Sequence, residues 1–557
     1  VERGPRERAR YGITYNGEIY NYLELKEELK QKGYTFFTHS DTEVILAAYD
    51  HWKDECLQQF DGMFAFAIWD EQEQTLFTAR DRFGEKPFYY FFDGEQFLFA
   101  SEMKALWAAG VEKTINHSML LNYIGLGWVK NPADLSQTFY ENISSLPQSH
   151  YLKLDMRTGK NEIGQYWDLD KETQTTLTEA EGIEQFQQLF STSVQRRLRS
   201  DVEGGTSLSG GLDSSAILAT ISRLHKASPS GGGLEGAFTA SFPNFEKDET
   251  AYAKLVAEQF QLQHHLVTPT AETLLTDIEK LIHHQEEPFQ SSSIYAQYKV
   301  YELAKQQGIK VILDGQGADE ILAGYHKYIH WFLQEKIRQS SVVSRELKAF
   351  ADHNIAVDWG WKNKLAARFP EIAAVQLENK ANKELLNNKF ISNSYRKTNF
   401  NKKSIFKPTV SKLNDLLYYN TMRLGLEELL RYADRNSMAH GVEVRLPFLS
   451  HELVQFIFSL PSHYKLQNGF TKYILRESMK QTLPSSIVYR TDKIGYEPPQ
   501  QQWMQSAGFQ ELLQNSRQKL VNENILKKEI LNQPVNAQSA HAVKNDDWRY
   551  FCAAHLL

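Results

Sequence analysis

The stretch SLSGGLDSS, at positions 207–215, constrains the fold of this 557-residue chain more than any other feature. It stands between a short strand-like run and a helical stretch. Glycines at such a junction leave backbone N–H groups available to an anion, and the positive end of the helix dipole favours negative charge there. A strand, a tight loop and a helix in this order form half of a βαβ unit, so we predict a parallel sheet.

Strands and helices continue to alternate beyond this stretch. A Thr-x-x-Glu capping box at Thr178 and Glu181 begins a helix whose apolar residues recur at helical spacing. Three strand-like runs follow, separated by helical segments: AFTASF (237–242), HHLV (264–267) and IKVILDG (309–315). We therefore predict an α/β domain over residues 178–557, mostly helical after Tyr325. In such sheets ligands bind beyond the carboxyl ends of the strands, where SGGLDSS and DGQGADE (314–320) both fall.

The side chains of the first loop indicate a phosphate site that also needs a cation. A Walker A loop would end in Gly-Lys-Ser/Thr, and no lysine follows here. The loop offers the hydroxyls of Ser209, Ser214 and Ser215 beside the carboxylate of Asp213. Mg²⁺ is usually held by one or two carboxylates plus substrate phosphates, and Asp319 supplies a second carboxylate in the later loop. The alternative is a Ser/Gly turn in which Asp213 caps the helix.

Residues 1–168 have a different pattern, typical of a β-rich domain. Short runs of aromatic and β-branched residues recur at hairpin spacing, and the Asp93-Gly94 pair marks a turn between two of them. One helix is predicted over 22–31, ended by Gly33. The strand-like run Gly204-Gly205-Thr206, before the SGGLDSS loop, is less apolar than a buried strand should be.

Composition bounds the location and the partners. The net charge of −7 does not indicate a protein that binds nucleic acid. Two cysteines form no disulfide framework and fit a reducing compartment. No apolar run approaches the ~18 residues of a membrane span, and the first residues lack the apolar core of a signal peptide. We expect a cytoplasmic protein with neither nucleic acid nor a membrane as partner.

Two further features are interpreted as structural. The basic segment 391–407 (ISNSYRKTNFNKKSIFK) is taken as a solvated loop rather than a nucleic-acid site. The histidine pairs 264–265 and 283–284 are not taken as metal ligands, because adjacent residues do not share a face of a helix or strand.

Several motifs resemble a known family. SGGLDSS resembles the pyrophosphate-binding loop of the ATP pyrophosphatases, which split ATP between the α and β phosphates. Other stretches resemble the glutaminase domain of glutamine-hydrolysing asparagine synthetases: YNGEIYN (15–21), SDTEV (40–44), ARDRFGEKPFYY (79–90) and FASEMKAL (99–106). Two more resemble the synthetase domain of that family: NSMAHGVEVRLPFLSHEL (436–453) and RTDKIGYEPPQQQW (490–503). The resemblance covers most of the chain.

This resemblance implies two domains with separate chemistry. Residues 1–168 would form an αββα Ntn-hydrolase-type sandwich, incomplete at its start, that acts as a class II glutamine amidotransferase. Residues 178–557 would form the ATP-pyrophosphatase domain. With ATP and Mg²⁺, it would convert the side-chain carboxylate of aspartate to β-aspartyl-AMP, and ammonia from glutamine would displace AMP. The expected partners are these small molecules, and a homodimer stays an open alternative.

The resemblance also assigns roles to individual residues. Asn16 and Gly17 match the oxyanion-hole positions, and Glu18 and Asp41 match contacts to glutamine. Lys493 matches the lysine near the phosphates. The positions implied for the nucleotide are Leu208, Ser209, Gly210, Gly211, Asp213, Ser214, Ser215, Ala240, Asp314 and Gly315. From the residues alone, Asn16-Gly17 could equally be a hairpin turn, and Asp41 a helix N-cap.

Two departures from the family pattern affect function. The family's nucleophile is an N-terminal cysteine, whereas this sequence begins at Val1 and its cysteines are Cys56 and Cys552. We expect an incomplete glutaminase domain and the use of free ammonia. Gln316 stands where the well-understood members carry a glutamate that forms the adenylate, and an amide cannot act as a carboxylate base.

These departures keep other functions open. One is a related adenylating synthetase that makes another amide, a lactam or a cyclic peptide with a degenerate glutaminase domain. A nucleic-acid thiolase disagrees with the acidic net charge, and an inactive scaffold disagrees with the presence of Asp213, Asp319 and Lys493.

Overall fold

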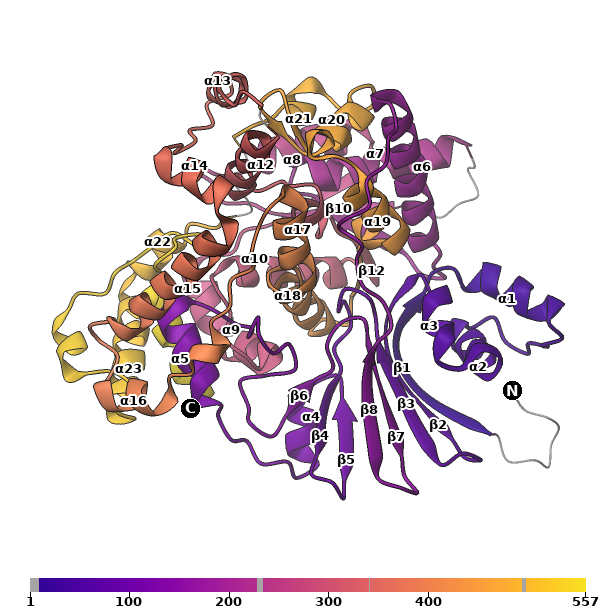
Figure 1. Cartoon of the computed structure of the whole chain (residues 1–557), viewed down its shortest axis with the longest axis horizontal. Helices are drawn as coiled ribbons and strands as arrows, with labels where there is room; N and C mark the ends of the chain where they lie inside the picture. The colour runs from indigo at the N-terminus through magenta and orange to yellow at the C-terminus, as the bar shows by residue number, and fades with distance from the viewer. Residues whose placement is uncertain (1–9, 228–233, 340, 493–496) are drawn as a thin grey trace. The chain divides into compact units, whose positions relative to one another are not determined.

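A computed structural model describes residues 10–227, 234–339, 341–492 and 497–557. The chain divides into two compact units (Figure 1). Unit 1 comprises Val1–Thr114 and Leu135–Leu169, and unit 2 comprises Ile115–Asp134 and Asp170–Leu557.

Unit 1 is an αββα sandwich. Its larger sheet is antiparallel, in the order β1-β2-β3-β7-β8. Those strands are β1 (Tyr11–Ile19), β2 (Gly62–Asp70), β3 (Thr75–Arg80), β7 (His150–Asp155) and β8 (Lys160–Gln165). The smaller sheet consists of β5 (Phe97–Ala100), β4 (Tyr89–Phe92) and β6 (Ser144–Ser145). The helices are α1 (Tyr22–Gln31), α2 (Asp41–Trp52), α3 (Cys56–Gln59) and α4 (Met103–Ala108).

The side chains of β2 point alternately to the two faces of the larger sheet, and this alternation produces the layers. Phe64, Phe66 and Ile68 belong to the core that the larger sheet shares with α1, α2 and α3. Ala65 and Ala67 point the other way, into a second core that includes side chains of β4 and β5. Successive strand residues face opposite sides of a sheet, so one aromatic and one small face let β2 serve two cores. The predicted αββα class is confirmed.

Unit 2 is built on a parallel five-stranded sheet in the order β11-β10-β9-β12-β13. The strands are β9 (Gly204–Ser207), β10 (Leu234–Ala240), β11 (Gln263–Val267), β12 (Val311–Leu313) and β13 (Glu443–Arg445). The second glycine of the central strand β9, Gly205, has a packing reason. A Cβ on Gly205 would lie 2.7 Å from the ring of Phe238 on β10, so an aromatic side chain fills the space that an apolar residue would take.

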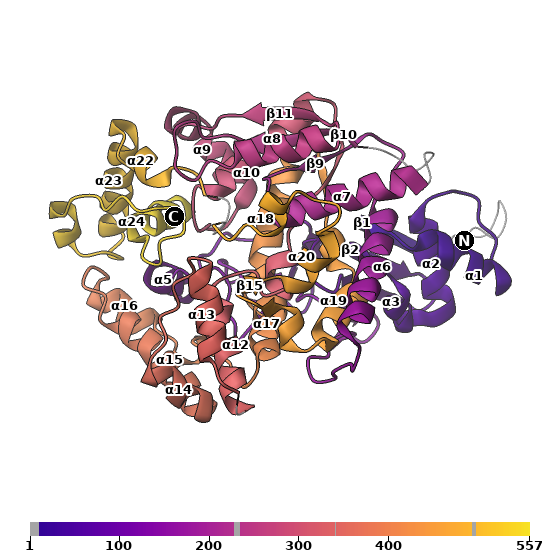
Figure 2. The same ribbon diagram turned by 90° about the horizontal axis from the view of Figure 1, so that it is seen from above.

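Helices connect and surround these strands (Figures 1 and 2). The predicted capping box of Thr178 and Glu181 begins the first helix after residue 170. The earlier helices of unit 2 are α5 (His117–Leu126), α6 (Glu179–Arg197), α7 (Leu212–Ala227), α8 (Thr250–Gln259), α9 (Ala271–Gln285), α10 (Ser293–Gln306), α11 (Ala318–Ile321) and α12 (Lys327–Arg338). Six more precede β13: α13 (Ser344–Asp352), α14 (Trp361–Arg368), α15 (Pro370–Leu386), α16 (Asn393–Asn399), α17 (Leu413–Met422) and α18 (Leu426–Met438).

The rest of unit 2 is mostly helical. After β13 come α19 (His451–Ser459), the short hairpin β14 (Leu466–Gln467) and β15 (Phe470–Thr471), and α20 (Tyr473–Met479). The last helices are α21 (Ser485–Val488), α22 (Gln500–Met504), α23 (Ala507–Asn522) and α24 (Asp546–Leu556). Within the described ranges, no helix is both long and apolar enough to span a bilayer.

The compact units divide the chain differently from the predicted domains, and one expectation about a loop needs correction. Residues 115–134, predicted within the first domain, belong to unit 2, because α5 packs against α15, α16 and α24. The segment 391–407 is not a loop throughout, since it contains α16 and a 3₁₀ turn at Lys402–Ser404. Its polar composition concealed these short helices.

Candidate active site

The glycine-rich loop follows the central strand, at the carboxyl edge of the sheet. It connects β9 to α7, which begins at Leu212, so the backbone N–H groups of the first helical turn lie at this edge. Gly210 has φ of +68°, and a Cβ there would lie 2.3 Å from the backbone nitrogen of Ala253. Only glycine fits this turn.

The loop that follows β12 packs directly against it. β12 is paired with β9, so their carboxyl ends are neighbours. A Cβ on Gly315 would lie 3.0 Å from Cβ of Asp213 and 3.1 Å from the backbone nitrogen of Ser214. The absence of a side chain at Gly315 therefore permits the close approach of the two predicted ligand loops, as the alternation of strands and helices indicated.

The side chains of Asp213 and Asp319 converge on one ammonium group. Nζ of Lys472 lies 2.8 and 2.6 Å from the carboxylate oxygens of Asp213 and 2.5 Å from Oδ1 of Asp319. Lys472 precedes α20 and has left-handed backbone geometry, with φ of 53°. Gly324 provides the space, since a Cβ there would lie 2.2 Å from Cε of Lys472.

The charges of this trio determine the protonation of the lysine. Burial alone would lower the pKa of Lys472, but the two carboxylates outweigh it and hold that pKa above its usual value. The ammonium is therefore charged at neutral pH. Sequence analysis did not single out Lys472, which lies 259 residues after Asp213 in the chain.

The carboxylates of Asp213 and Asp319 provide part of the ligand set that the predicted Mg²⁺ needs. Two carboxylates that share one cation in the protein can share another, and Mg²⁺ takes one or two carboxylates with the substrate phosphates. Across the described portion of the chain, no three acidic, histidine or cysteine side chains are grouped for a metal. Asp213 and Asp319 could thus hold a magnesium ion only together with phosphate oxygens or water.

Two buried polar atoms of the predicted site residues have no protein partner among the residues that the structure describes. They are Oγ of Ser215 and Oε1 of Gln316. The amide nitrogen of Gln316 lies 3.5 Å from Asp314, which also accepts hydrogen bonds from Tyr301 at 3.0 Å and from the backbone N–H of Gly315 at 2.7 Å. Buried polar atoms are normally satisfied, so these two are available to a ligand.

Glu320 lies next to Asp319 and has an unusual environment. Its carboxyl group is buried and accepts a hydrogen bond of 2.6 Å from Tyr325. Burial, and then the charge of Asp319, raise its pKa to about 7. No sequence signal other than its place in DGQGADE pointed to it.

The remaining predicted nucleotide positions lie at the ends of the central strands. Leu208 follows β9 and donates its backbone N–H to Phe238, and Ala240 is the last residue of β10. Next to them, Thr239 and His264 are hydrogen-bonded at 2.8 Å, while His265 stacks on Phe238. Lys493 lies outside the described residues.

The predicted oxyanion-hole residues lie inside a strand of unit 1. Asn16 and Gly17 belong to β1, where they pair with Ala65 and Phe64, so the hairpin-turn alternative is wrong. Gly17 has φ of +144°, and a Cβ there would lie 2.0 Å from the carbonyl oxygen of Met63. The amide of Asn16 donates to Ser101 at 3.2 Å, which joins YNGE to FASEMK.

Asp41 is anchored close to this strand. Its Oδ2 accepts hydrogen bonds from the Tyr15 hydroxyl at 2.7 Å and from the backbone N–H of Ile19 at 2.9 Å. Asp41 is not the helix N-cap, because Ser40 caps α2 by accepting from the backbone of Thr42. Glu18 pairs with Met63 along β1.

Neither cysteine is prepared for nucleophilic attack. Cys56 begins α3 and Cys552 lies in α24, and both are buried. Burial raises the pKa of the Cys56 thiol well above its usual value and that of Cys552 to about 12. Thiolates are the reactive form, so both side chains are inert at neutral pH.

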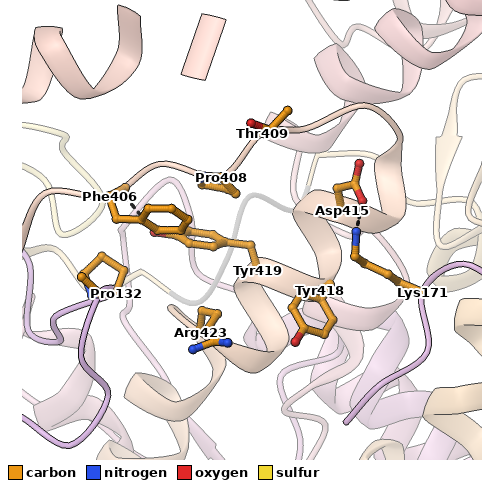
Figure 3. A pocket seen from close by; sticks show the side chains of 10 residues that line it. Pro132, Lys171, Phe406, Pro408, Thr409, Asp415, Tyr418, Tyr419 and Arg423 are labelled. Carbon is orange, nitrogen blue, oxygen red and sulfur yellow. Dashed lines mark hydrogen bonds and ion pairs between the residues drawn. The ribbon is translucent and has the colours of Figure 1, made fainter. Parts of the chain in front are cut away.

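A cavity of about 460 Å³ lies elsewhere in unit 2 (Figure 3). Its walls include Phe406, Tyr418, Tyr419 and Arg423, and an ion pair between Lys171 and Asp415 closes one side. It contains none of the residues predicted from the sequence.

Fold and site define a class first. An αββα unit and a parallel-sheet unit with a hydroxyl-rich loop at its carboxyl edge, in one chain, define a two-domain class. The comparisons then give the family. The model of the asparagine synthase family matches residues 185–555, and that of the glutamine amidotransferase domain matches residues 5–167. The chain belongs to the asparagine synthase family.

Curated relatives extend this result over most of the chain. "Asparagine synthetase [glutamine-hydrolyzing] 1" of Bacillus subtilis is 31% identical over 89% of this chain and 77% of its own length. "Asparagine synthetase [glutamine-hydrolyzing] 3" of the same organism is 30% identical over 86% and 74%. A differently named relative, "Amidase chyE" of Penicillium rubens, is 27% identical over 88% and 77%.

Proposed function

We propose that this chain is a carbon–nitrogen ligase that amidates aspartate to asparagine through a β-aspartyl-AMP intermediate at the expense of ATP. The observation that carries the proposal is the convergence of Asp213 and Asp319 on Lys472 beside the glycine-rich loop. The ATP chemistry is assigned to residues 178–557 and glutamine binding to residues 1–168. We place the reaction in the cytoplasm, with a homodimer as an open question.

Adenylation makes the amidation possible. A carboxylate is a poor electrophile at neutral pH, whereas a mixed anhydride with AMP has a good leaving group. The glycine-rich loop and the first turn of α7 would hold the pyrophosphate through backbone N–H groups, with Ser209, Ser214 and Ser215 adding hydroxyl donors. Leu208, Gly210, Gly211 and Ala240 would shape the nucleotide site.

Charge on the phosphates would be neutralised from several directions. Asp213 and Asp319 would hold Mg²⁺, which when bound offsets charge that develops on pyrophosphate. Asp213 and Asp319 hold the ammonium of Lys472 next to the loop that would bind the phosphates. Lys472 would therefore act on the phosphates as a point charge. Lys493 is assigned to the same task by its motif.

Gln316 would position the acceptor rather than move its proton. An amide oxygen accepts hydrogen bonds but does not take up a proton at neutral pH. The unpaired Oε1 of Gln316 can bind a donor on the substrate, while Asp314 and Gly315 hold the loop that carries it.

We propose that unit 2 takes its nitrogen as ammonia and that neither Cys56 nor Cys552 releases that ammonia from glutamine. Asn16, Gly17, Glu18 and Asp41 would bind glutamine and offer an oxyanion hole. Attack on the glutamine amide needs a thiolate, and both cysteines in the sequence are buried with raised pKa values. We therefore expect amidation with ammonium and little release of glutamate from glutamine.

A second candidate is an adenylating synthetase that acts on another carboxylic acid. Gln316 favours it, because this position differs from the glutamate of the well-understood asparagine synthetases. The relative named "Amidase chyE" indicates that the similarity extends to proteins with other names.

The discriminating experiment measures AMP and amide formation from ATP, ammonium and a panel of carboxylic acids. AMP and asparagine with aspartate are expected. ADP with phosphate would overturn the reaction class, and AMP with a different acid alone would overturn only the substrate. Glutamate release from glutamine, abolished by Cys56→Ala or Cys552→Ala, would contradict the assignment of ammonia.

A further inference from the structure

One segment of unit 2 reverses the charge of the protein. Residues 361–407 contain eleven Lys and Arg against three Glu and no Asp, although the whole chain has a net charge of −7. The segment includes α14, α15 and α16, which follow one another along one edge of unit 2 (Figures 1 and 2).

The cations at the start of this segment are exposed. Lys362, Lys364 and Arg368 all lie on α14 and are open to solvent. Among the described residues, no acidic side chain forms an ion pair with any of the three, and the first acid along the segment is Glu371. Their positive charge is therefore available to an external partner.

The same helices also turn large apolar side chains outward. Trp361, Leu365, Phe369 and Ile372 are 70%, 47%, 49% and 55% exposed. Trp361 and Leu365 lie one turn apart on α14, Phe369 stands at the junction between α14 and α15, and Ile372 lies in the first turn of α15. The inward face carries small residues instead, since Ala367 and Ala374 are buried. We call the outward set with its flanking cations, Lys362, Lys364 and Arg368, the α14 surface.

Large apolar side chains seldom gather on a surface that stays in water. A contiguous exposed apolar patch usually marks a contact site. Apolar residues along one face with Lys and Arg beside them are typical of helices that lie in a lipid interface. Cations near such a helix bind anionic headgroups.

We propose that the α14 surface docks on an anionic lipid bilayer, with the four apolar side chains at the headgroup boundary and the three cations on the headgroups. A second copy of the chain fits less well, because a two-fold contact would bring equal positive patches together. RNA would use the cations but not Leu365 and Ile372. The proposal departs from our expectation of no membrane partner, which rested on the lack of a spanning segment; a surface contact needs none.

The test is flotation of the full-length chain with vesicles of phosphatidylcholine alone and of phosphatidylcholine mixed with phosphatidylglycerol. We expect binding only to the anionic vesicles, weakened by added salt. The double variant Trp361→Ser/Phe369→Ser should lower the affinity about tenfold. Phe37→Ser is the matched control, since Phe37 is an aromatic residue 74% exposed outside this surface.

The charges are tested separately. Lys364→Gln and Arg368→Gln should each weaken vesicle binding about fivefold, whereas Lys254→Gln, at a lysine with 68% side-chain exposure on α8, should not. Ammonium-dependent AMP release without vesicles should stay unchanged in all these variants. Equal binding to neutral vesicles would overturn the proposal. So would RNA binding without vesicle binding, or self-association that Trp361→Ser/Phe369→Ser abolishes while vesicle binding persists.

Discussion

The two candidate sites differ in what their polar groups already bind. At the sheet edge of unit 2, Ser215 and Gln316 keep buried atoms without protein partners in the described structure, and Lys472 stands between two carboxylates. In unit 1, Asn16 and Asp41 are hydrogen-bonded to Ser101, Tyr15 and Ile19. One site has unmet bonding capacity, while the other must exchange protein hydrogen bonds for ligand bonds.

This difference helps to compare two candidate sites that resemble the family equally well in sequence. Both sites carry several family motifs. In unit 2, Asp213 and Asp319 pair with Lys472 and stand in the same two segments, 207–215 and 314–320, as the unpartnered atoms of Ser215 and Gln316, whereas Asn16 and Asp41 of unit 1 already have protein partners. A buried polar atom without a partner costs about 1–3 kcal/mol, which a ligand can recover. The comparison therefore predicts that substitutions at the two sites will have unequal effects on ammonium-dependent chemistry.

The largest effect should come from the carboxylate pair. Asp213→Asn removes a charge that Lys472 contacts and that the proposed metal would share, so AMP release with ammonium should fall about 10³-fold. Asp41→Asn, the matched change in unit 1, should leave that rate within about twofold, since Asp41 is assigned to the proposed glutamine site. Equal losses in the two variants would break the comparison.

A glycine in β1 tests whether unit 1 can be damaged without harm to unit 2. Gly17→Ala places a Cβ against the Met63 carbonyl and should lower the free energy of unfolding of unit 1 by about 3 kcal/mol. Gly12→Ala is the control, because nothing lies within 4 Å of a Cβ at that position on the same strand. Hydrogen exchange of unit 1 gives the measurement, and AMP release with ammonium should persist.

The buried lysines Lys465 and Lys472 show how neighbouring acids affect the pKa of a buried amine. Lys465 forms no ion pair with the described residues. It donates to the Leu460 carbonyl at 2.7 Å, and burial lowers its pKa to about 7 against the opposing charge of Glu335. Between pH 7 and 10.5 the unfolded chain holds this proton while the folded chain does not, so stability should rise with pH. Lys465→Met should raise the free energy of unfolding by on the order of 2 kcal/mol at pH 6.

The increase in the free energy of unfolding from Lys465→Met should become smaller toward pH 10, because Lys465 in the folded protein is already neutral there. Denaturant unfolding of both proteins at several pH values measures the difference. A gain that is constant from pH 6 to pH 10 would show that the charge of Lys465 is not its cause.

The smallest predicted effect concerns metal binding without nucleotide. Lys472→Met removes the cation that competes for Asp213 and Asp319, so the affinity for Mn²⁺, used as a probe, should rise about tenfold. Lys480→Met, at the exposed end of the same helix, should not change it. Weaker binding by Lys472→Met would mean that the lysine organises the carboxylates instead of competing with a metal.

Local sequence signals were sufficient for much of this fold. The capping box of Thr178, the alternation of strands and helices, and the two loops at the carboxyl edge follow from patterns within a few residues of each other. Gly205 shows where such reasoning falls short, because its partner Phe238 on β10 is not marked in the sequence of β9.

Contacts between distant segments could not be predicted in this way. Lys472 reaches the site from a short hairpin and helix far along the chain, and no periodicity marks it. Ser40 and Asp41 are both good N-cap residues, and only the hydrogen bonds from Tyr15 and Ile19 decide between them. The packing of α5 with unit 2 likewise depends on helices that follow it by hundreds of residues.

The position of Lys472 has a consequence for the order in which reactants enter. With the ammonium between Asp213 and Asp319, the protein itself supplies a counterion where a divalent ion would go. A free metal ion must displace it and would leave a buried ammonium without its partners. A nucleotide that arrives with its metal offers the lysine phosphate oxygens in return. The trio thus favours entry of the metal–nucleotide complex as one reactant, with the acceptor acid added to a site whose charges are already matched.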